Sequence, residues 1–83
     1  MEKSIYSDEY KHFIKLLRAS RERSGLTQQE IASRLNATQT FVSKCERGER
    51  RLDVIELQAW CSALGIALSE FLVELEKTRP NCQ

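Results

Sequence analysis

The stretch from Gly25 to Gly48, GLTQQEIASRLNATQTFVSKCERG, predicts two short helices joined by a tight connection. The first helix is expected from Gln28 to Leu35, and one of its faces carries the apolar side chains Ile31, Ala32 and Leu35. The second is expected from Gln39 to Arg47 and has few apolar positions. This difference indicates that the first helix serves the core, whereas the second leaves most of its side chains free.

Capping signals mark where these two helices begin and end. Thr27 and Glu30 have the T-x-x-E spacing of a capping box, in which each side chain accepts from the other residue's backbone N–H. Thr38 is placed to cap the second helix, and Gly48 follows its end. Asn36, between the helices, tolerates the positive φ that a tight turn needs. The sequence therefore predicts a helix-turn-helix.

A longer helix is predicted before this stretch. Ser7 is expected to cap it, and Asp8 and Glu9 place negative charge in its first turn, where the helix dipole favours anions. Gly25 ends it in the left-handed region. Its stripe at helical period consists of Tyr10, Phe13, Ile14, Leu17 and Arg21. Tyr10, like Tyr6, either packs at the start of this helix or contacts DNA or another partner.

Two more helices are predicted after the stretch. Asp53 and Glu56 form a second capping box, and Gly65 ends the helix that this box starts. The buried side of that helix is expected to carry Val54, Leu57, Trp60, Cys61 and Leu64. Ser69 is expected to start a last helix, whose apolar positions are Phe71, Leu72 and Leu75. The result is an all-α domain of five helices at residues 7–77, with an arm at 1–6 and a flexible tail at 78–83.

Charge is unevenly distributed along the 83 residues, although the net charge is only +1. Residues 11–51 hold ten Lys and Arg against four Glu, a local charge of +6, and the other residues hold three bases against eight acids, a charge of −5. Such segregation suits a polyanionic partner on one face and another role for the opposite face. Solvated helix faces of mixed charge are the alternative.

Several classes of function find no support in the composition. Cys45, Cys61 and Cys82 have no CxxC spacing and His12 is the single histidine, so we expect no metal site. Long apolar runs and a secretion signal are absent, and we therefore expect a cytoplasmic protein without a membrane segment. No phosphate loop or catalytic grouping is recognisable. We expect neither an enzyme nor a cofactor, and no small-molecule ligand is evident.

The second helix of the opening stretch has an exposed face of amides, hydroxyls and cations. Its members are Gln39, Thr40, Ser43, Lys44 and Arg47. In the major groove of DNA, Lys pairs with O6 and N7 of guanine, and Gln with N6 and N7 of adenine. This chemistry predicts a helix that reads DNA bases. An ordinary solvent-facing surface is the alternative for each residue taken alone.

Short motifs along the chain resemble the phage Cro/cI-type repressor family, also called XRE-like. They are LTQQEIA at 26–32, FVSK at 41–44, ERG at 46–48 and ALGI at 63–66. The resemblance covers about residues 13 to 75. Asn36 replaces the glycine usual at the turn, and Cys45 replaces a larger apolar side chain. The family implies a five-helix domain that binds DNA, usually as a dimer on a near-palindromic operator.

The resemblance also implies roles for single positions. Gln39, Thr40 and Lys44 fall where the family reads bases. Contacts to the DNA backbone are implied for Gln28, for Arg47 and for one or both of Arg50 and Arg51, to which we add Ser43. Arg21 and Glu46 match the positions of an ion pair that ties the first helix to the third in this family. Pairing is also what two charged side chains on otherwise apolar faces require.

The last helix has more apolar side chains than its own core needs. We therefore predict a dimer interface at Phe71, Leu72 and Leu75, with a fully intramolecular face as the alternative. The expected function is that of a homodimeric, sequence-specific regulator, by default a repressor, on double-stranded DNA. An activator, a restriction–modification controller and an antitoxin belong to the same class. A protein-interaction module of the same fold without DNA binding is the alternative.

Overall fold

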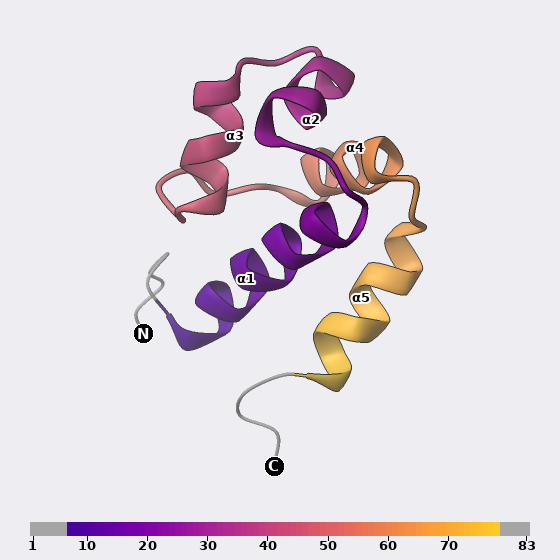
Figure 1. The fold of residues 1–83 in the computed structure, drawn as a ribbon. Helices are drawn as coiled ribbons and strands as arrows, with labels where there is room; N and C mark the ends of the chain where they lie inside the picture. Colours follow the sequence, from indigo (N-terminus) through magenta and orange to yellow (C-terminus); the bar gives the residue numbers. More distant parts are fainter. Residues whose placement is uncertain (1–6, 79–83) are drawn as a thin grey trace.

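The computed structural model describes residues 7–78, which form five helices and no strand (Figure 1). The helices are α1 (Asp8–Arg23), α2 (Gln28–Leu35), α3 (Gln39–Glu46), α4 (Val54–Leu64) and α5 (Leu68–Lys77). The predicted all-α fold is confirmed. The predicted arm at 1–6 lies outside the described residues, as does the predicted tail beyond Thr78, which itself caps α5.

The predicted caps of the helix-turn-helix are present. Thr27 Oγ1 accepts from the backbone N–H of Glu30 at 3.1 Å, and Glu30 Oε1 accepts from the N–H of Thr27 at 2.9 Å. Thr38 Oγ1 accepts from the N–H of Phe41 at 3.0 Å. Asn36 holds a left-handed backbone, with φ of 59°. These local bonds set the direction in which α3 leaves α2.

Two details of α4 and α5 differ from the predictions. Val54 is 58% exposed and does not join the buried side of α4, because it lies in the first turn, beyond the reach of the neighbouring helices. The last helix begins at Leu68, not at Ser69, and its N-cap is Ala67. No side-chain oxygen caps it, and Glu70 Oε1 instead accepts from the N–H of Ala67 at 3.4 Å.

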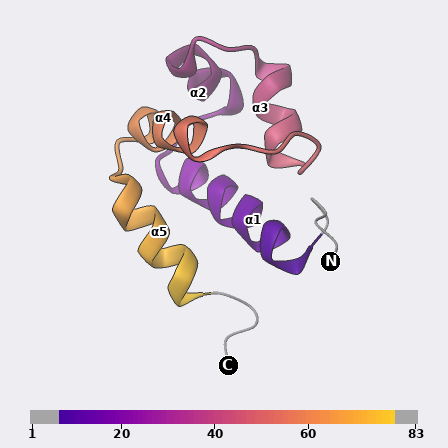
Figure 2. The ribbon, with the colours of Figure 1, turned by 180° about the vertical axis from the view of Figure 1, so that it is seen from behind.

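The core lies where all five helices meet. The α1 helix packs against α3 and α5, while α4 packs against α2 and α5 (Figures 1 and 2). The buried apolar side chains of the core are Leu16, Leu17, Ile31, Ala32, Val42, Cys45, Leu57, Trp60, Cys61, Leu64 and Phe71. This core fixes α2 and α3 on α1 and α4, and it leaves the outer side of α3 free.

The two described cysteines are core residues. Both side chains are free thiols, and Cys45 and Cys61 are at most 1% exposed. Burial raises the pKa of the Cys45 thiol to about 11 and that of Cys61 above its usual value. Buried, protonated thiols of this kind behave as small apolar side chains. Cys82 lies outside the described residues.

The helices of residues 7–78 are short for a membrane span. No single helix there is both long and apolar enough to cross a bilayer, and only α4 and α5 taken together, bent by 107°, reach the required length and composition.

Candidate nucleic-acid interface

The outer side of α3 carries the side chains that were predicted to read bases. Gln39, Thr40 and Lys44 are exposed, while Val42, Cys45 and Glu46 of the same helix face inward. Ser43 is half-buried and, with Gln39, Thr40 and Arg47, lines a shallow hollow on the surface. This face therefore presents one amide group, two hydroxyls and two cations to the solvent.

A buried ion pair holds α3 against α1. Arg21 Nε donates to Glu46 Oε2 at 2.7 Å, and Arg21 Nη2 donates to Glu46 Oε1 at 3.1 Å. A third donor of the same guanidinium, Nη1, reaches the carbonyl oxygen of Leu26 at 2.8 Å, just before α2. The two side chains are 10% and 2% exposed. One arginine thus joins α1, the start of α2 and α3.

Gln28 extends this network toward the exposed face of α3. Its Nε2 donates to Glu46 Oε1 at 3.0 Å, and its Oε1 accepts a long bond from Gln39 Nε2 at 3.5 Å. Gln28 is half-buried. The residue predicted to contact a phosphate therefore also connects the buried carboxylate of Glu46 to the predicted base-reading amide of Gln39.

Arg47, at the end of α3, is held in place by neighbours on its own segment. Its guanidinium donates to both oxygens of Glu49, at 3.0 and 3.2 Å, and also donates to Ser43 Oγ. The hydrogen bond from Arg47 lowers the pKa of the Glu49 carboxyl and raises that of Arg47. About half of each side chain of the pair remains exposed.

Arg50 and Arg51 differ in partners although they are neighbours in the α3–α4 loop, residues 47–53. Arg50 donates to both oxygens of Glu56 at 3.1 and 2.9 Å, and to the carbonyl oxygen of Arg51 at 2.8 Å. Its Cζ also lies 4.9 Å from the ring centroid of Phe41. The bond from Arg50 lowers the pKa of the Glu56 carboxyl. Arg50 is therefore a clamp between the loop, α3 and α4, and supports a DNA contact less than its neighbour does.

Arg51 lies over the ring of Tyr10, with its Cζ 4.5 Å from the ring centroid. Tyr10 also accepts a hydrogen bond from the backbone N–H of Leu52 at 3.2 Å. The sequence did not predict these contacts to the α3–α4 loop. The available signal was an aromatic residue in the first turn of a helix and a pair of arginines in a loop, which does not say that the two segments meet.

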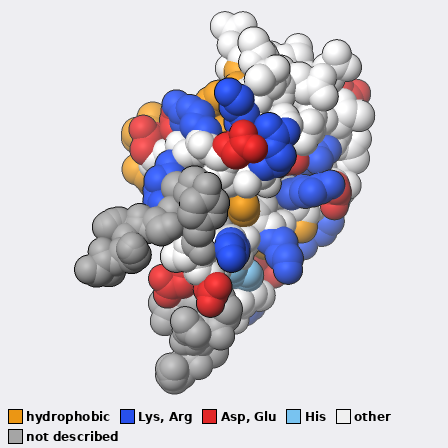
Figure 3. Space-filling model, turned by 90° about the vertical axis from the view of Figure 1, so that its left-hand side faces the viewer, with side chains coloured by type: hydrophobic (Ala, Val, Ile, Leu, Met, Phe, Trp, Pro, Cys, Tyr) orange, Lys and Arg blue, Asp and Glu red, His pale blue; other side chains and the backbone are white. Residues whose placement is uncertain are grey.

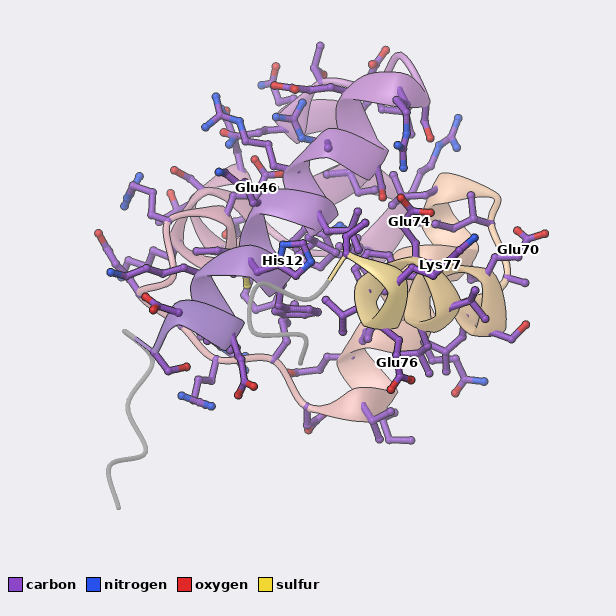
Figure 4. The ribbon with its side chains drawn as sticks, turned by 90° about the horizontal axis from the view of Figure 1, so that it is seen from below. His12, Glu46, Glu70, Glu74, Glu76 and Lys77 are labelled. Atoms are coloured by element: carbon purple, nitrogen blue, oxygen red, sulfur yellow. The ribbon has the colours of Figure 1, made fainter. Side chains whose placement is uncertain are left out.

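The segregation of charge along the chain is also present in space. Exposed cations occur on α1, α3 and the α3–α4 loop, among them Lys11, Lys15, Lys44, Arg47 and Arg51. Figure 3 views the left-hand side of Figure 1 and shows Lys and Arg side chains gathered there. The α5 helix carries Glu70, Glu74 and Glu76 with one Lys, as labelled in Figure 4. The cationic side therefore includes α3, and the acidic helix lies away from it.

The residues predicted for a dimer interface separate into two kinds. Phe71 is 3% exposed and its ring centroid lies 5.9 Å from that of Phe13, edge-on, so Phe71 is a core residue with little surface left for a second copy. Leu75 is half-buried against the core, and Leu72 is 40% exposed. Val73, which lies on the same helix, is 56% exposed. Exposed apolar surface on α5 is thus provided by Leu72 and Val73.

Among residues 7–78, no cluster of three or more His, Cys, Asp or Glu side chains is suited to bind a metal ion.

Known proteins are similar to this chain over most of its length. A family model described as helix-turn-helix matches residues 17–71. The control protein C.MunI from a Mycoplasma species is 32% identical over 63 residues, 76% of this chain and 85% of that protein. The structure of an XRE-family like protein from Pseudomonas syringae pv. tomato str. DC3000 covers 87% of this chain and 88% of its own, with 43% identity and a TM-score of 0.80.

A second solved structure is that of a restriction–modification controller protein, C.Esp1396I, as a tetramer in complex with its natural 35 base-pair operator. It is 25% identical and has a TM-score of 0.78, covering 86% of this chain and 93% of that chain. The family match at residues 17–71 contains the whole of α2 and α3.

Proposed function

Because the chain belongs to the helix-turn-helix family of DNA-binding transcriptional regulators, we propose that it acts as a homodimeric repressor on a palindromic operator. The observation that carries the proposal is the outer face of α3, where Gln39, Thr40 and Lys44 are exposed beside further cations. A helix with such a face fits the major groove, whose floor presents donors and acceptors. A domain bound over a promoter excludes the polymerase by occupying its site.

Each base-reading residue has a definite chemistry. Gln39 offers a donor and an acceptor, which match N6 and N7 of adenine, and Lys44 offers donors to O6 and N7 of guanine. The Thr40 methyl group suits the methyl group of thymine. One good pair of this kind discriminates between bases by about 1–3 kcal/mol.

Contacts to the DNA backbone position α3 without reading sequence. Arg47 and Ser43 lie at the end of α3 and Gln28 at the start of α2, so they flank the base-reading face on both sides. Arg51 adds an exposed cation in the loop that follows. Arg50 supports this surface through its bonds to Glu56.

Dimerisation is the part of the proposal that rests on α5. Leu72 and Val73 expose apolar side chains at 40% and 56%, and burial against a second copy would remove them from water. A symmetric dimer would present two copies of α3 about 34 Å apart, which is one turn of DNA. Its operator would then be a palindrome.

Selection of bound duplexes from a random library tests the proposal most directly. We expect one recovered sequence with two inverted half-sites about 10 base pairs apart, centre to centre. Its affinity should fall with salt by a slope of about −0.9 for each phosphate neutralised. Absence of any duplex binding at about 50 mM salt would instead favour the protein-interaction module.

Control of a restriction–modification system is a second candidate role. Two of the similar proteins, C.MunI and C.Esp1396I, are named as control or controller proteins. Such a role predicts two adjacent operators and a complex of four protein chains on one duplex. Analytical ultracentrifugation of the complex with the selected DNA distinguishes it from a single dimer, and a recovered site with only one palindrome would contradict it.

A further inference from the structure

The hydroxyl of Tyr10 lies where α1 meets the α3–α4 loop. Its oxygen has a hydrogen-bond donor there, but its hydrogen has no acceptor among residues 7–78. The oxygen accepts from the backbone N–H of Leu52 at 3.2 Å. A phenol also carries one hydrogen of its own, and no acceptor takes it within the described range. Burial raises the pKa of the Tyr10 hydroxyl above its usual 10.0, so the group is a protonated donor at neutral pH.

Arg51 lies over the ring that carries this hydroxyl, and its guanidinium is exposed to solvent. Its Cζ lies 4.5 Å from the Tyr10 ring centroid, and the side chain is exposed. Its neighbour Arg50 is bound by Glu56, whereas Arg51 has no carboxylate partner among residues 7–78. A cation–π contact orients a guanidinium without using a hydrogen bond. Of these two neighbouring arginines, Arg50 is therefore paired with a carboxylate, and Arg51 is not paired with one among residues 7–78.

We propose that Tyr10 and Arg51 together bind one phosphate of the DNA backbone, with the tyrosine hydroxyl as a neutral donor and the guanidinium as a charged donor. The proposal rests on the proposed DNA-binding function. Arg51 lies in the loop that follows α3, so the phosphate would flank the groove that α3 enters. The bond from Leu52 orients the hydroxyl before DNA arrives, which reduces the entropy that binding must spend.

A double-mutant cycle on Tyr10 and Arg51 tests this pair. Tyr10→Phe removes only the hydroxyl and keeps the ring that meets Arg51 and Phe13. We expect it to weaken binding of a fluorescein-labelled selected duplex about tenfold, as does loss of one hydrogen bond to a charged group, and to do so on every sequence alike. Arg51→Ala should lower the salt slope by about 1. In the Arg51→Ala background, Tyr10→Phe should cost much less, because both donors serve one phosphate.

Two controls separate a phosphate contact from a purely structural hydroxyl. Urea unfolding measures the cost of leaving the N–H of Leu52 without its acceptor, which should be the same with and without Arg51. A duplex with a neutral methylphosphonate at the contacted phosphate should bind wild type and both variants nearly equally. Failure of the wild type to bind DNA would overturn the proposed function. If the wild type binds, equal binding by Tyr10→Phe, or independent effects of the two substitutions, would overturn this inference alone.

Discussion

Arg–Glu pairs occur on two sides of α3, and they differ in burial. Beneath the helix, the side chains of Arg21 and Glu46 are 10% and 2% exposed, while in the following loop those of Arg50 and Glu56 are 43% and 32% exposed. The first pair has lost most of its water and depends on each partner to remain satisfied. The second keeps solvent as an alternative partner. Similar bonds therefore brace the fold in one region and order a loop in the other.

The largest expected effect is that of breaking the buried pair. Glu46→Ala leaves the guanidinium of Arg21 buried without its charge partner, and it also removes the acceptor of Gln28. We expect a loss of about 3–5 kcal/mol in the free energy of unfolding, measured in urea. Replacing both partners by apolar residues, as in Arg21→Met with Glu46→Leu, should recover most of that loss. A small effect of Glu46→Ala would show that the two regions do not differ as proposed.

The thiol of Cys45, on the inward-facing side of α3, makes the same region sensitive to alkali. The folded pKa of Cys45 is raised to about 11 from 9.0, so between these values the unfolded chain loses a proton that the folded chain keeps. Stability should therefore be full below pH 9.0 and fall as pH rises toward 11, by about 2–3 kcal/mol for two pKa units. Urea unfolding at several pH values measures this decline. It should become shallower in Cys45→Ala, and an unchanged profile would contradict the assignment to this thiol.

Lys44 on α3 and Arg51 in the α3–α4 loop should affect DNA binding in different ways. Lys44→Ala on α3 is expected to relax the preference for one base pair in each half-site, by about 1–3 kcal/mol. Arg51→Ala in the loop should weaken binding to all sequences alike. Competition between the selected duplex and single-base variants measures both effects. The reverse pattern would mean that reading and positioning are assigned to the wrong residues.

The smallest expected effect is that of breaking the exposed pair. A double-mutant cycle of Arg50→Ala and Glu56→Ala should yield a coupling of at most about 1 kcal/mol in unfolding free energy. Glu56 also accepts from the N–H of Asp53, so Arg50→Ala is the cleaner single change. High salt should reduce the coupling, unlike that of the buried pair. A coupling as large as that of Arg21 and Glu46 would contradict the expected difference between the exposed and the buried pair.

Local signals account for the parts of the fold that could be predicted from the sequence. Thr27, Asn36 and Thr38 act within a few residues of their own backbone, so their spacing alone indicated the two helices and the turn. The same reasoning failed at Ser69, because a helix needs no capping hydroxyl where the Glu70 carboxylate accepts the N–H of Ala67. Local chemistry allowed both solutions at that point, and the pattern of side chains did not distinguish them.

The candidate site could be predicted in part. An arginine and a glutamate on apolar stripes of two helices must find each other, and the family resemblance named the same pair, Arg21 and Glu46. By contrast, the adjacent residues Arg50 and Arg51 look alike in the sequence. Their difference comes from Glu56 and Tyr10, which approach the loop from α4 and α1. Periodicity does not contain this information.

The sequence alone is sufficient to predict the five helices, the N-caps of the first four and the polar face of α3, because helical period and backbone hydrogen bonding depend on neighbours within about four residues. Tertiary structure alone decided that Phe71 is core, that Val54 and Val73 are exposed, and which arginine of the loop keeps a free charge. Burial and the choice of ionic partner depend on segments far apart in the chain. They exist only once α1, α4 and α5 have packed around α3.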